Sequence, residues 1–300
     1  MKVKNVGEIA LIKRISTKIR LDKSVVKGIG DDTAVIKWTK DKYLLFTCDM
    51  IIENVHFRRP RATPYQIGRK ALARNISDIA AMGGIPKYAV VSLGVNPNTK
   101  VSVADEILKG IIDLAKRFKI NIVGGDTVRS DKLVIDISLV GEVEKKNLVL
   151  RSGARIGDLI FVTGMIGGSQ KGKHLNFTPR VEEARALVGK FKINSMIDVS
   201  DGLLLDLNRI LEASSAGGRI YEKLVPIVKN SGSFEKCVSE GEDFELLFTM
   251  TPREAIKAAK MKIKTPVSLI GQIIDNGKGL RLVRRDGVEK QIDAKGYLHF

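Results

Sequence analysis

The sequence of 300 residues has few of the side chains that form disulfides and zinc sites. It contains two cysteines, Cys48 and Cys237, and three histidines, His56, His174 and His299. Two cysteines exclude a disulfide framework and a zinc site with the usual four ligands. So few histidines make a His/Cys metal centre unexpected, and no Ser/His or Cys/His arrangement for nucleophilic catalysis stands out.

Long apolar runs and aromatic residues are also scarce. No stretch approaches the roughly 18 apolar residues that a membrane span needs, and the first residues contain no apolar stretch of signal-peptide length. We therefore expect a cytoplasmic protein with no membrane partner. Aromatic residues make up 5% of the chain, which disfavours the base-stacking surface of a single-strand-binding protein.

Acidic residues are outnumbered by basic ones. The 51 Lys and Arg residues exceed the 34 Asp and Glu residues, so the formal net charge is +17. A charge of this size is typical of nucleic-acid-binding proteins, but it also occurs on a lysine-rich solvated surface. The basic residues are dispersed, and the positions of the acidic residues favour the second interpretation, with no nucleic-acid partner.

Strand and helix patterns alternate along the whole chain. Apolar runs predict strands over 43–51, 87–95, 132–143, 158–164, 245–250, 267–273, 279–284 and 287–292. Helices are predicted over 64–82, 103–118, 181–190, 203–214 and 252–261. The helix over 64–82 has a defined start, because Thr63 and Gln66 have capping-box spacing and Pro64 suits the first helical position. The mixture predicts an α+β fold with two domains, 1–147 and 148–300.

Acidic residues gather in six segments with apolar or glycine-rich surroundings. These segments are 28–35 (GIGDDTAV), 47–49 (TCD), 75–78 (NISD), 124–127 (GGDT, predicted as a strand that runs into a glycine turn), 198–202 (DVSDG) and 241–244 (GEDF). Some have plain structural explanations, such as a helix cap at Asp201. Asp49 is harder to explain, because a carboxylate at the end of an apolar strand is costly unless it is paired or bound to a metal. Together the segments predict a site for Mg²⁺, which prefers oxygen ligands and often shares them with phosphates.

Residues 167–173 (GGSQKGK) have the glycine and lysine spacing of a P-loop. The next residue is His174, where a P-loop has Ser or Thr, and Pro179 prevents the long helix that should follow. We therefore reject a P-loop here. A flexible glycine loop that covers a phosphate remains an open alternative.

The motifs follow one another in a specific order. They are GIGDDTAV, TCD, ENVHF, NISDIAAMGG, GGDT, RSGARIGD, the pair Pro179-Arg180, DVSDGLLLD, GEDFELLFT and the final GYLHF. In this ordered set the chain resembles the thiamine-monophosphate kinases, a family of the aminoimidazole ribonucleotide synthetase-like superfamily, over essentially its whole length. The resemblance implies two-domain subunits whose amino-terminal sheets pair into a barrel across a homodimer.

The resemblance also implies an activity. It is the Mg²⁺-dependent, direct in-line transfer of the γ-phosphoryl group of ATP to thiamine monophosphate, which gives thiamine diphosphate. The enzyme would be a phosphotransferase with a phosphate group as acceptor, acting in thiamine diphosphate biosynthesis. Two alternatives stay open: another ATP-using enzyme of the same superfamily, and a basic nucleic-acid-binding protein.

Roles for single residues follow from the same resemblance. The implied ligands of several Mg²⁺ ions are Asp32, Thr47, Cys48, Asp49, Asp78, Asp126, Asp198 and Asp201, of which Asp49, Asp126 and Asp198 form the implied catalytic set. The implied contacts to ATP are Gly125, Asp126, Arg151 and Ser200, and those to thiamine monophosphate are His56, Glu242 and Tyr297. The family usually has Thr in place of Cys48, so a ligand role through the side chain would be weakened here, whereas a role through the backbone would not.

Overall fold

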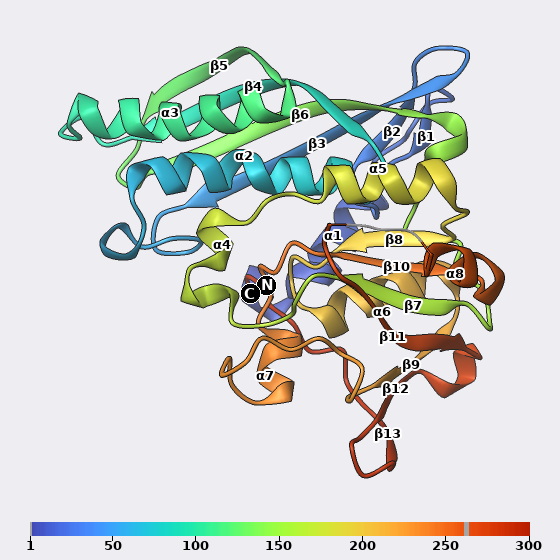
Figure 1. The fold of residues 1–300 in the computed structure, drawn as a ribbon. Helices are drawn as coiled ribbons and strands as arrows, with labels where there is room; N and C mark the ends of the chain where they lie inside the picture. The colour runs from blue at the N-terminus through green and yellow to red at the C-terminus, as the bar shows by residue number, and fades with distance from the viewer. Residues whose placement is uncertain (1, 261–263) are drawn as a thin grey trace.

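The computed structural model describes residues 2–260 and 264–300, which form two mixed β-sheets with helices between and beside them (Figure 1). The first sheet has the order β1-β2-β3-β6-β4-β5, and only the β4–β5 pair is parallel. Its strands are β1 (Val25–Lys27), β2 (Ala34–Lys37), β3 (Lys42–Ile52), β4 (Ile85–Val95), β5 (Asn121–Arg129) and β6 (Val134–Glu144). The helices of this half are α1 (Glu8–Ser16), α2 (Pro64–Ala81) and α3 (Val101–Phe118).

The second sheet has the order β13-β12-β9-β11-β7-β10-β8, and only the β12–β9 pair is parallel. Its strands are β7 (Leu159–Thr163), β8 (Ser195–Asp198), β9 (Gly217–Tyr221), β10 (Leu246–Met250), β11 (Val267–Ile274), β12 (Leu280–Val283) and β13 (Glu289–Gln291). The helices are α4 (Lys173–Asn176), α5 (Val181–Lys190), α6 (Leu203–Ser214), α7 (Phe234–Ser239) and α8 (Pro252–Ala258). The two sheets confirm the predicted α+β class, while the boundary at 147/148 stays a prediction.

Helix α2 lies between the two sheets and contacts both of them, as Figure 1 shows. Its start is the predicted capping box: the Gln66 amide donates to Thr63 Oγ1 at 3.2 Å, and the Thr63 amide donates to Gln66 Oε1 at 3.0 Å. Most of the helix is buried, including Ile67, Leu72 and Ile76. This position makes α2 the element that can present side chains to both halves.

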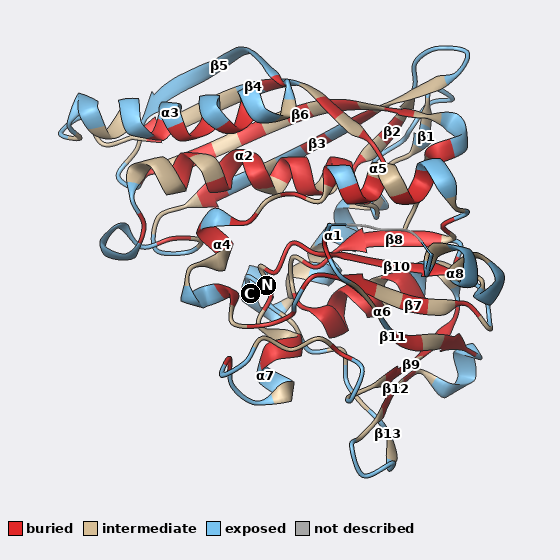
Figure 2. Ribbon diagram, viewed as in Figure 1, coloured by how far each residue is buried: buried red, intermediate tan, exposed pale blue. Residues whose placement is uncertain are grey.

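One apolar core joins the two halves of the chain. It contains Leu45 and Ile137 of the first sheet, α2, and Leu187, Phe248 and other residues of the second half. Figure 2 shows this buried layer on both sides of α2. Because apolar burial is the main stabilising contribution to folding, the two halves depend on each other for stability.

The other face of the first sheet is exposed and largely apolar. Strand register aligns Phe46 with Val140 and Tyr88, and it aligns Met50 with Asp136 and Ser92, on the side turned away from α2. Phe46, Met50 and Tyr88 are each more than 40% exposed. A contiguous apolar face of this kind marks an interaction surface more often than a solvated one.

Two sequence predictions about the first sheet are wrong. The GGDT segment is not a turn, because β5 runs without a break to Arg129. A Cβ at Gly125 would lie 1.9 Å from the Val91 carbonyl oxygen, so this glycine permits close approach of the strands. Asp49 does not end its strand either, since β3 continues to Ile52.

Several short elements were not predicted, among them β1, β2, β8, β9, α1 and α7. The predicted end of the helix over 252–261 lies outside the described residues. In the described part of the chain, no helix is both long enough and apolar enough to cross a bilayer. A cytoplasmic location stays a prediction.

Candidate active site

Three carboxylates from distant parts of the sequence meet where the two halves join. Oxygens of Asp32, Asp78 and Asp198 lie within 4.8 Å of one another, the one such acidic group found among the described residues. Asp78 is presented by α2, Asp198 ends β8, and Asp32 lies in the turn before β2. Two hydroxyl groups hold the cluster: Thr47 donates to Asp78 at 2.6 Å, and Ser77 donates to Asp198 at 2.6 Å.

The electrostatics of this cluster fit a cation. Burial raises the pKa of Asp78 well above its ordinary value, and the charges of Asp49, Asp198 and Asp32 raise it further. Burial, followed by the charge of Asp32, raises the pKa of Asp198 in the same way. The buried Oδ2 of Asp32 has no hydrogen-bond partner among the described residues. Three close oxygen ligands and an unpartnered buried oxygen are the donor set that a hard divalent cation prefers.

Basic side chains on two sides of the cluster balance part of this charge. Arg151 donates through Nη2 to Asp32 at 2.7 Å, and its backbone amide donates to Asp31 at 3.2 Å. On the other side, Arg74 of α2 donates through Nε to Asp49 at 3.1 Å. In the structure Asp49 is therefore paired with an arginine, and its carboxylate is not a member of the three-carboxylate cluster.

The side chains of Thr47 and Cys48, the two residues before Asp49, point to opposite faces of β3. Thr47 is buried on the α2 side, whereas Cys48 is exposed on the other face. The Cys48 thiol donates to Asp136 Oδ1 at 3.1 Å. The thiol therefore faces away from the carboxylates that Thr47 supports, which leaves only the Cys48 backbone to act on that side.

The structure does not bring Gly125, Asp126 or Asp201 into the cluster. Strands β6 and β4 separate β3 from β5, so Asp126 is displaced from the Asp49 strand by three strand spacings, about 14 Å. Asp126 is exposed. Strand register aligns it with Ser92, which is aligned through Asp136 with Met50, so Asp126 belongs to the exposed face of the sheet. Asp201 lies near the cluster in sequence but pairs with Arg209 at 2.7 Å.

A cavity of about 490 Å³ is linked to the acidic cluster through its lining, which includes Ser200, two residues after Asp198, and Arg74, the partner of Asp49. His56, Glu242 and Tyr297, to which the family resemblance gives contacts with one substrate, all line it as well. Burial, followed by the charges of Arg74 and His299, lowers the pKa of His56 to about 3, so the ring is neutral near pH 7. Its Nδ1 accepts from the Ile52 amide at 3.0 Å, which leaves Nε2 as the donor.

Lys70, which the sequence did not single out, is fully buried behind three residues that line this cavity. Its Nζ contacts Glu242 Oε1 at 2.5 Å, donates to the His56 carbonyl at 2.7 Å and lies 2.9 Å from His174 Nδ1. Burial lowers the pKa of Lys70 to about 8, while the charge of Glu242 opposes this shift. Burial raises the pKa of the Glu242 carboxyl, but the contacts of this carboxyl with His174 and Lys70 outweigh burial and lower its pKa to about 2. Lys70 thus joins three walls of the cavity.

A signal for Lys70 was present in the sequence. Lys70, Arg74 and Asp78 recur every fourth residue of a helix whose other positions are mostly apolar. Residues at i, i+4 and i+8 lie on one helix face, so this spacing describes a polar stripe in a buried helix.

The amides of Gly167 and Gly168, at the centre of the glycine segment 164–172, already have carboxylate partners. The amide of Gly167 donates to both oxygens of Asp243 at 3.0 Å, and that of Gly168 donates to Glu240 Oε2 at 3.2 Å. Carboxylates of the protein therefore occupy the positions that phosphate oxygens would take in a P-loop. This geometry agrees with the rejection of a P-loop and disfavours a phosphate-covering loop.

The raised pKa of Asp78 has a consequence for stability in the absence of metal. The folded protein binds this proton more tightly than the unfolded chain, so its contribution to the free energy of unfolding falls as pH rises above about 3.8. We expect Asp78→Asn to be more stable than the wild type in EDTA, by a margin that grows between pH 5 and pH 7.5. Urea unfolding at both pH values tests this, and an equal margin at both would contradict it.

Comparison with known proteins assigns the fold to a class. Models of the AIR synthase related protein, N-terminal domain, and of the AIR synthase related protein, C-terminal domain, match residues 30–143 and 136–283. The two-sheet fold, with carboxylates gathered at the junction of its halves, is therefore that of an AIR synthase related protein.

Relatives that match the chain over nearly its full length identify the family within this class. The chain is 36% identical to the thiamine-monophosphate kinase of Bacillus subtilis (strain 168), over 98% of this chain and 99% of the relative. It is 33% identical to that of Escherichia coli (strain K12), over 98% of each. The solved structure of AaThiL complexed with AMPPCP and TMP matches with a TM-score of 0.87 and 31% identity, over 100% of this chain and 99% of that one. The chain belongs to the thiamine-monophosphate kinase family, which confirms the resemblance seen in the sequence.

Proposed function

We propose that this protein transfers the γ-phosphoryl group of ATP to thiamine monophosphate and releases thiamine diphosphate and ADP. The observation that carries the proposal is the cluster of Asp32, Asp78 and Asp198, together with a cavity that Glu242 and His56 line and that Ser200 connects to the strand of Asp198. The full-length similarity to thiamine-monophosphate kinases, and to a structure complexed with AMPPCP and TMP, supports it.

The cluster is the proposed site of Mg²⁺, with Asp32, Asp78 and Asp198 as its ligands from one chain. When bound, the metal neutralises phosphate charge and orients the reacting oxygens. Asp49 joins this set once it is released from Arg74, and the Cys48 backbone lies next to it in β3. Arg151, held beside the cluster by Asp32, is placed to neutralise nucleotide phosphates, and Ser200 lies at the cavity edge.

The cavity is the proposed site for the acceptor. Glu242 stays ionised and so complements the cationic thiazolium ring of thiamine monophosphate, while His56 and Tyr297 contribute ring surfaces. The attacking phosphate oxygen is already ionised near pH 7, so the reaction needs no general base. The task of the chain is then to position two anions in line and to neutralise their charge.

A turnover assay tests this proposal directly. Purified protein with ATP, thiamine monophosphate and Mg²⁺ should form thiamine diphosphate and ADP in equal amounts, and EDTA should stop the reaction. Folded protein that forms no thiamine diphosphate would overturn the proposal. Salt-sensitive DNA binding without ATP turnover would favour the nucleic-acid alternative instead.

We also propose that the protein is a homodimer that pairs through the exposed face of the first sheet. This face holds Phe46, Met50 and Tyr88, and β5 forms its fully exposed edge. Asp126 lies on this surface rather than near the three carboxylates of its own chain. The proposal therefore includes an exchange in which Asp126 and Gly125 of each subunit complete the site of the other.

Mixing two inactive variants tests the exchange. Equal amounts of Asp126→Asn and Asp198→Asn, after subunit exchange, should recover about a quarter of wild-type activity, because half of the dimers are mixed and each holds one intact site. Asp78→Asn mixed with Asp198→Asn is the matched control, since both residues belong to the same chain's cluster. The control should recover nothing, and no recovery in the first mixture would place Asp126 outside the partner's site.

A further inference from the structure

The segment 241–245, which delivers Glu242 to the cavity, has an unusual backbone. Glu242 and Phe244 have φ values of 59° and 50°, in the left-handed region that side chains with a Cβ seldom adopt. Hydrogen bonds fix the segment from one side: the Glu242 amide donates to the Ser200 carbonyl at 2.7 Å, and the Phe244 amide donates to the Val199 carbonyl at 2.8 Å. Backbone in this region persists only where its surroundings hold it.

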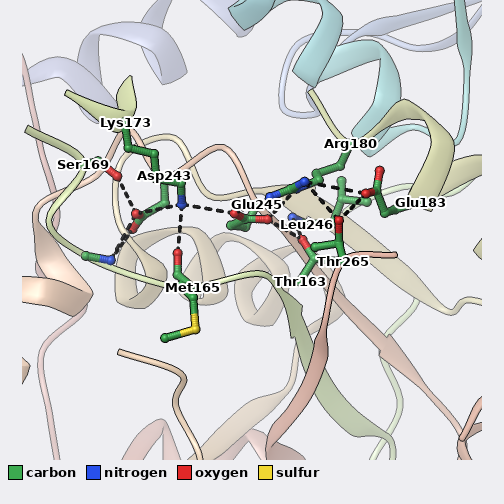
Figure 3. Close-up of polar contacts among 11 residues, drawn as sticks. Thr163, Met165, Ser169, Lys173, Arg180, Glu183, Asp243, Glu245, Leu246 and Thr265 are labelled. Atoms are coloured by element: carbon green, nitrogen blue, oxygen red, sulfur yellow. Dashed lines mark hydrogen bonds and ion pairs between the residues drawn. The ribbon is translucent and has the colours of Figure 1, made fainter. Parts of the chain in front are cut away.

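Two buried carboxylates of the same segment hold it from the other side. Glu245, whose side chain is 1% exposed, accepts from Arg180 Nε at 2.6 Å and from Arg180 Nη2 at 2.8 Å. Lys173 Nζ lies 3.0 Å from Glu245 Oε1 and 3.5 Å from Asp243 Oδ1. Figure 3 shows these four charged side chains as one connected network, with Thr163 also donating to Glu245. Glu183, also drawn there, lies 3.6 Å from Arg180 Nη1 and accepts from Thr265, so two cationic side chains hold three carboxylates in place.

The network also fixes the glycine segment 164–172. Ser169 donates to Asp243 at 2.5 Å, and Lys173 donates to the Met165 carbonyl at 2.8 Å (Figure 3). A Cβ at Gly167 would lie 2.5 Å from Cys237 Cβ, so the segment is packed tightly as well as bonded. Moving it would leave the buried Asp243 carboxylate without its donors, which is costly.

The fixed glycine segment in turn contacts Glu242. Gln170 Nε2 donates to Glu242 Oε2 at 2.9 Å, and His174 Nδ1 lies 3.1 Å from the same oxygen. Side chains of residues 242–245 therefore point in two directions. Glu242 faces the cavity, whereas Asp243 and Glu245 face the network.

A second cavity, of about 540 Å³, adjoins the network. Four basic residues line it, Arg117, Lys173, Arg180 and Lys264, but so do the carboxylates of Glu182, Glu183 and Glu245, which disfavours an anion site. The fork of Arg180 and the ammonium group of Lys173 are also both already bonded to Glu245, so they have little capacity left for a further anion. The network is better explained by what it holds in place.

We propose that Lys173, Arg180, Asp243 and Glu245 form a positioning unit for the acceptor. The unit fixes segment 241–245 against the glycine segment, so that Glu242 meets Lys70 with the geometry that binds thiamine monophosphate. This inference rests on the proposed function, and it assigns none of the four residues to contact with either substrate.

Substrate-specific kinetics separate positioning from general stability. Glu245→Gln keeps the shape of the side chain but removes its charge, and it should raise the KM for thiamine monophosphate about tenfold or more while the KM for ATP stays within about twofold. Arg180→Ala should behave alike, and Arg180→Lys, which keeps the charge without the fork, should lie between Arg180→Ala and the wild type. Should Glu245→Gln fail to fold, Arg180→Lys decides the test.

Glu289→Gln is the matched control, because Glu289 also bridges two cationic side chains, Arg219 and Arg281, on strands remote from the cavity. It should leave both KM values unchanged. If the network variants shift the KM for thiamine monophosphate no more than this control, or raise both KM values in parallel, the positioning role is overturned.

Hydrogen exchange provides a readout that does not depend on turnover. Amides of the peptide spanning 164–173 should lose protection in Glu245→Gln and in Asp243→Asn, while peptides of α2 keep theirs. Unchanged protection would overturn the positioning unit. If the wild type phosphorylates no thiamine monophosphate, the proposed function fails, and the exchange result still decides whether the network fixes the glycine segment.

Discussion

Asp198→Asn is expected to lower kcat for thiamine monophosphate by about a thousandfold or more, equivalent to about 4 kcal/mol of transition-state stabilisation. Asp198 is 1% exposed and contributes one of the three clustered carboxylates. Asn has the same shape, and its oxygen can still accept from Ser77, so the fold should persist. The loss therefore reflects the missing charge. Steady-state kinetics at saturating Mg²⁺ measure it.

The same substitution is expected to raise the midpoint of thermal unfolding in EDTA. Without a cation, the Asp198 carboxylate is buried among others of the same sign, and its removal relieves that repulsion. Asp275→Asn is a suitable control, because Asp275 is exposed and keeps its turn bond to the Gly277 amide as Asn. Near-normal turnover of Asp198→Asn would remove this residue from the site, and a lowered midpoint in EDTA would contradict the electrostatic explanation.

Lys70→Met is expected to reduce the free energy of unfolding by about 3–5 kcal/mol, because it leaves the buried charge of Glu242 without its closest partner. Met has a similar length and no charge, so the loss measures the pair rather than a cavity. The double variant Lys70→Met/Glu242→Gln should recover much of the loss, since neither charge remains. Urea unfolding of the four proteins gives the coupling energy between the two side chains.

An exposed pair provides the control for this cycle. Lys257 and Glu254 are 2.5 Å apart on α8, and the Lys257 side chain is 53% exposed. Lys257→Met should cost less than about 1 kcal/mol, because water screens such pairs. If the effects of Lys70→Met and Glu242→Gln simply add, the two residues are not coupled and Lys70 does not organise the cavity.

Local signals in the sequence predicted α2 and, with it, one wall of the site. The capping box and the apolar periodicity involve neighbours in the chain, so they hold whatever the tertiary structure. The acidic segments that supply Asp32, Asp78 and Asp198 were also recognisable, because charge in an apolar setting requires compensation. These features needed no knowledge of strand order.

Features that depend on strand order, or on partners that are remote in the sequence, could not be predicted from local sequence signals. The distance of Asp126 from its own cluster follows from β6 inserting between β3 and β4, which no local pattern encodes. The spacing of Lys70 on α2 is visible in the sequence, but its partners Glu242 and His174 come from the other half of the chain, so its role was not predictable. Asp201 pairs with Arg209, eight residues downstream on α6, and its role as a metal ligand stays a prediction.

The core shared by the two halves has a consequence for how the chain folds as it is made. The amino-terminal sheet and α2 are synthesised first, yet their apolar layer is completed by Leu187, Phe248 and Met250. A nascent chain that has emerged only as far as β6 still exposes the side of α2 that these residues cover. We therefore expect this layer to complete its folding on the ribosome only after β10 has emerged, and the exposed surface to be a site of aggregation until then.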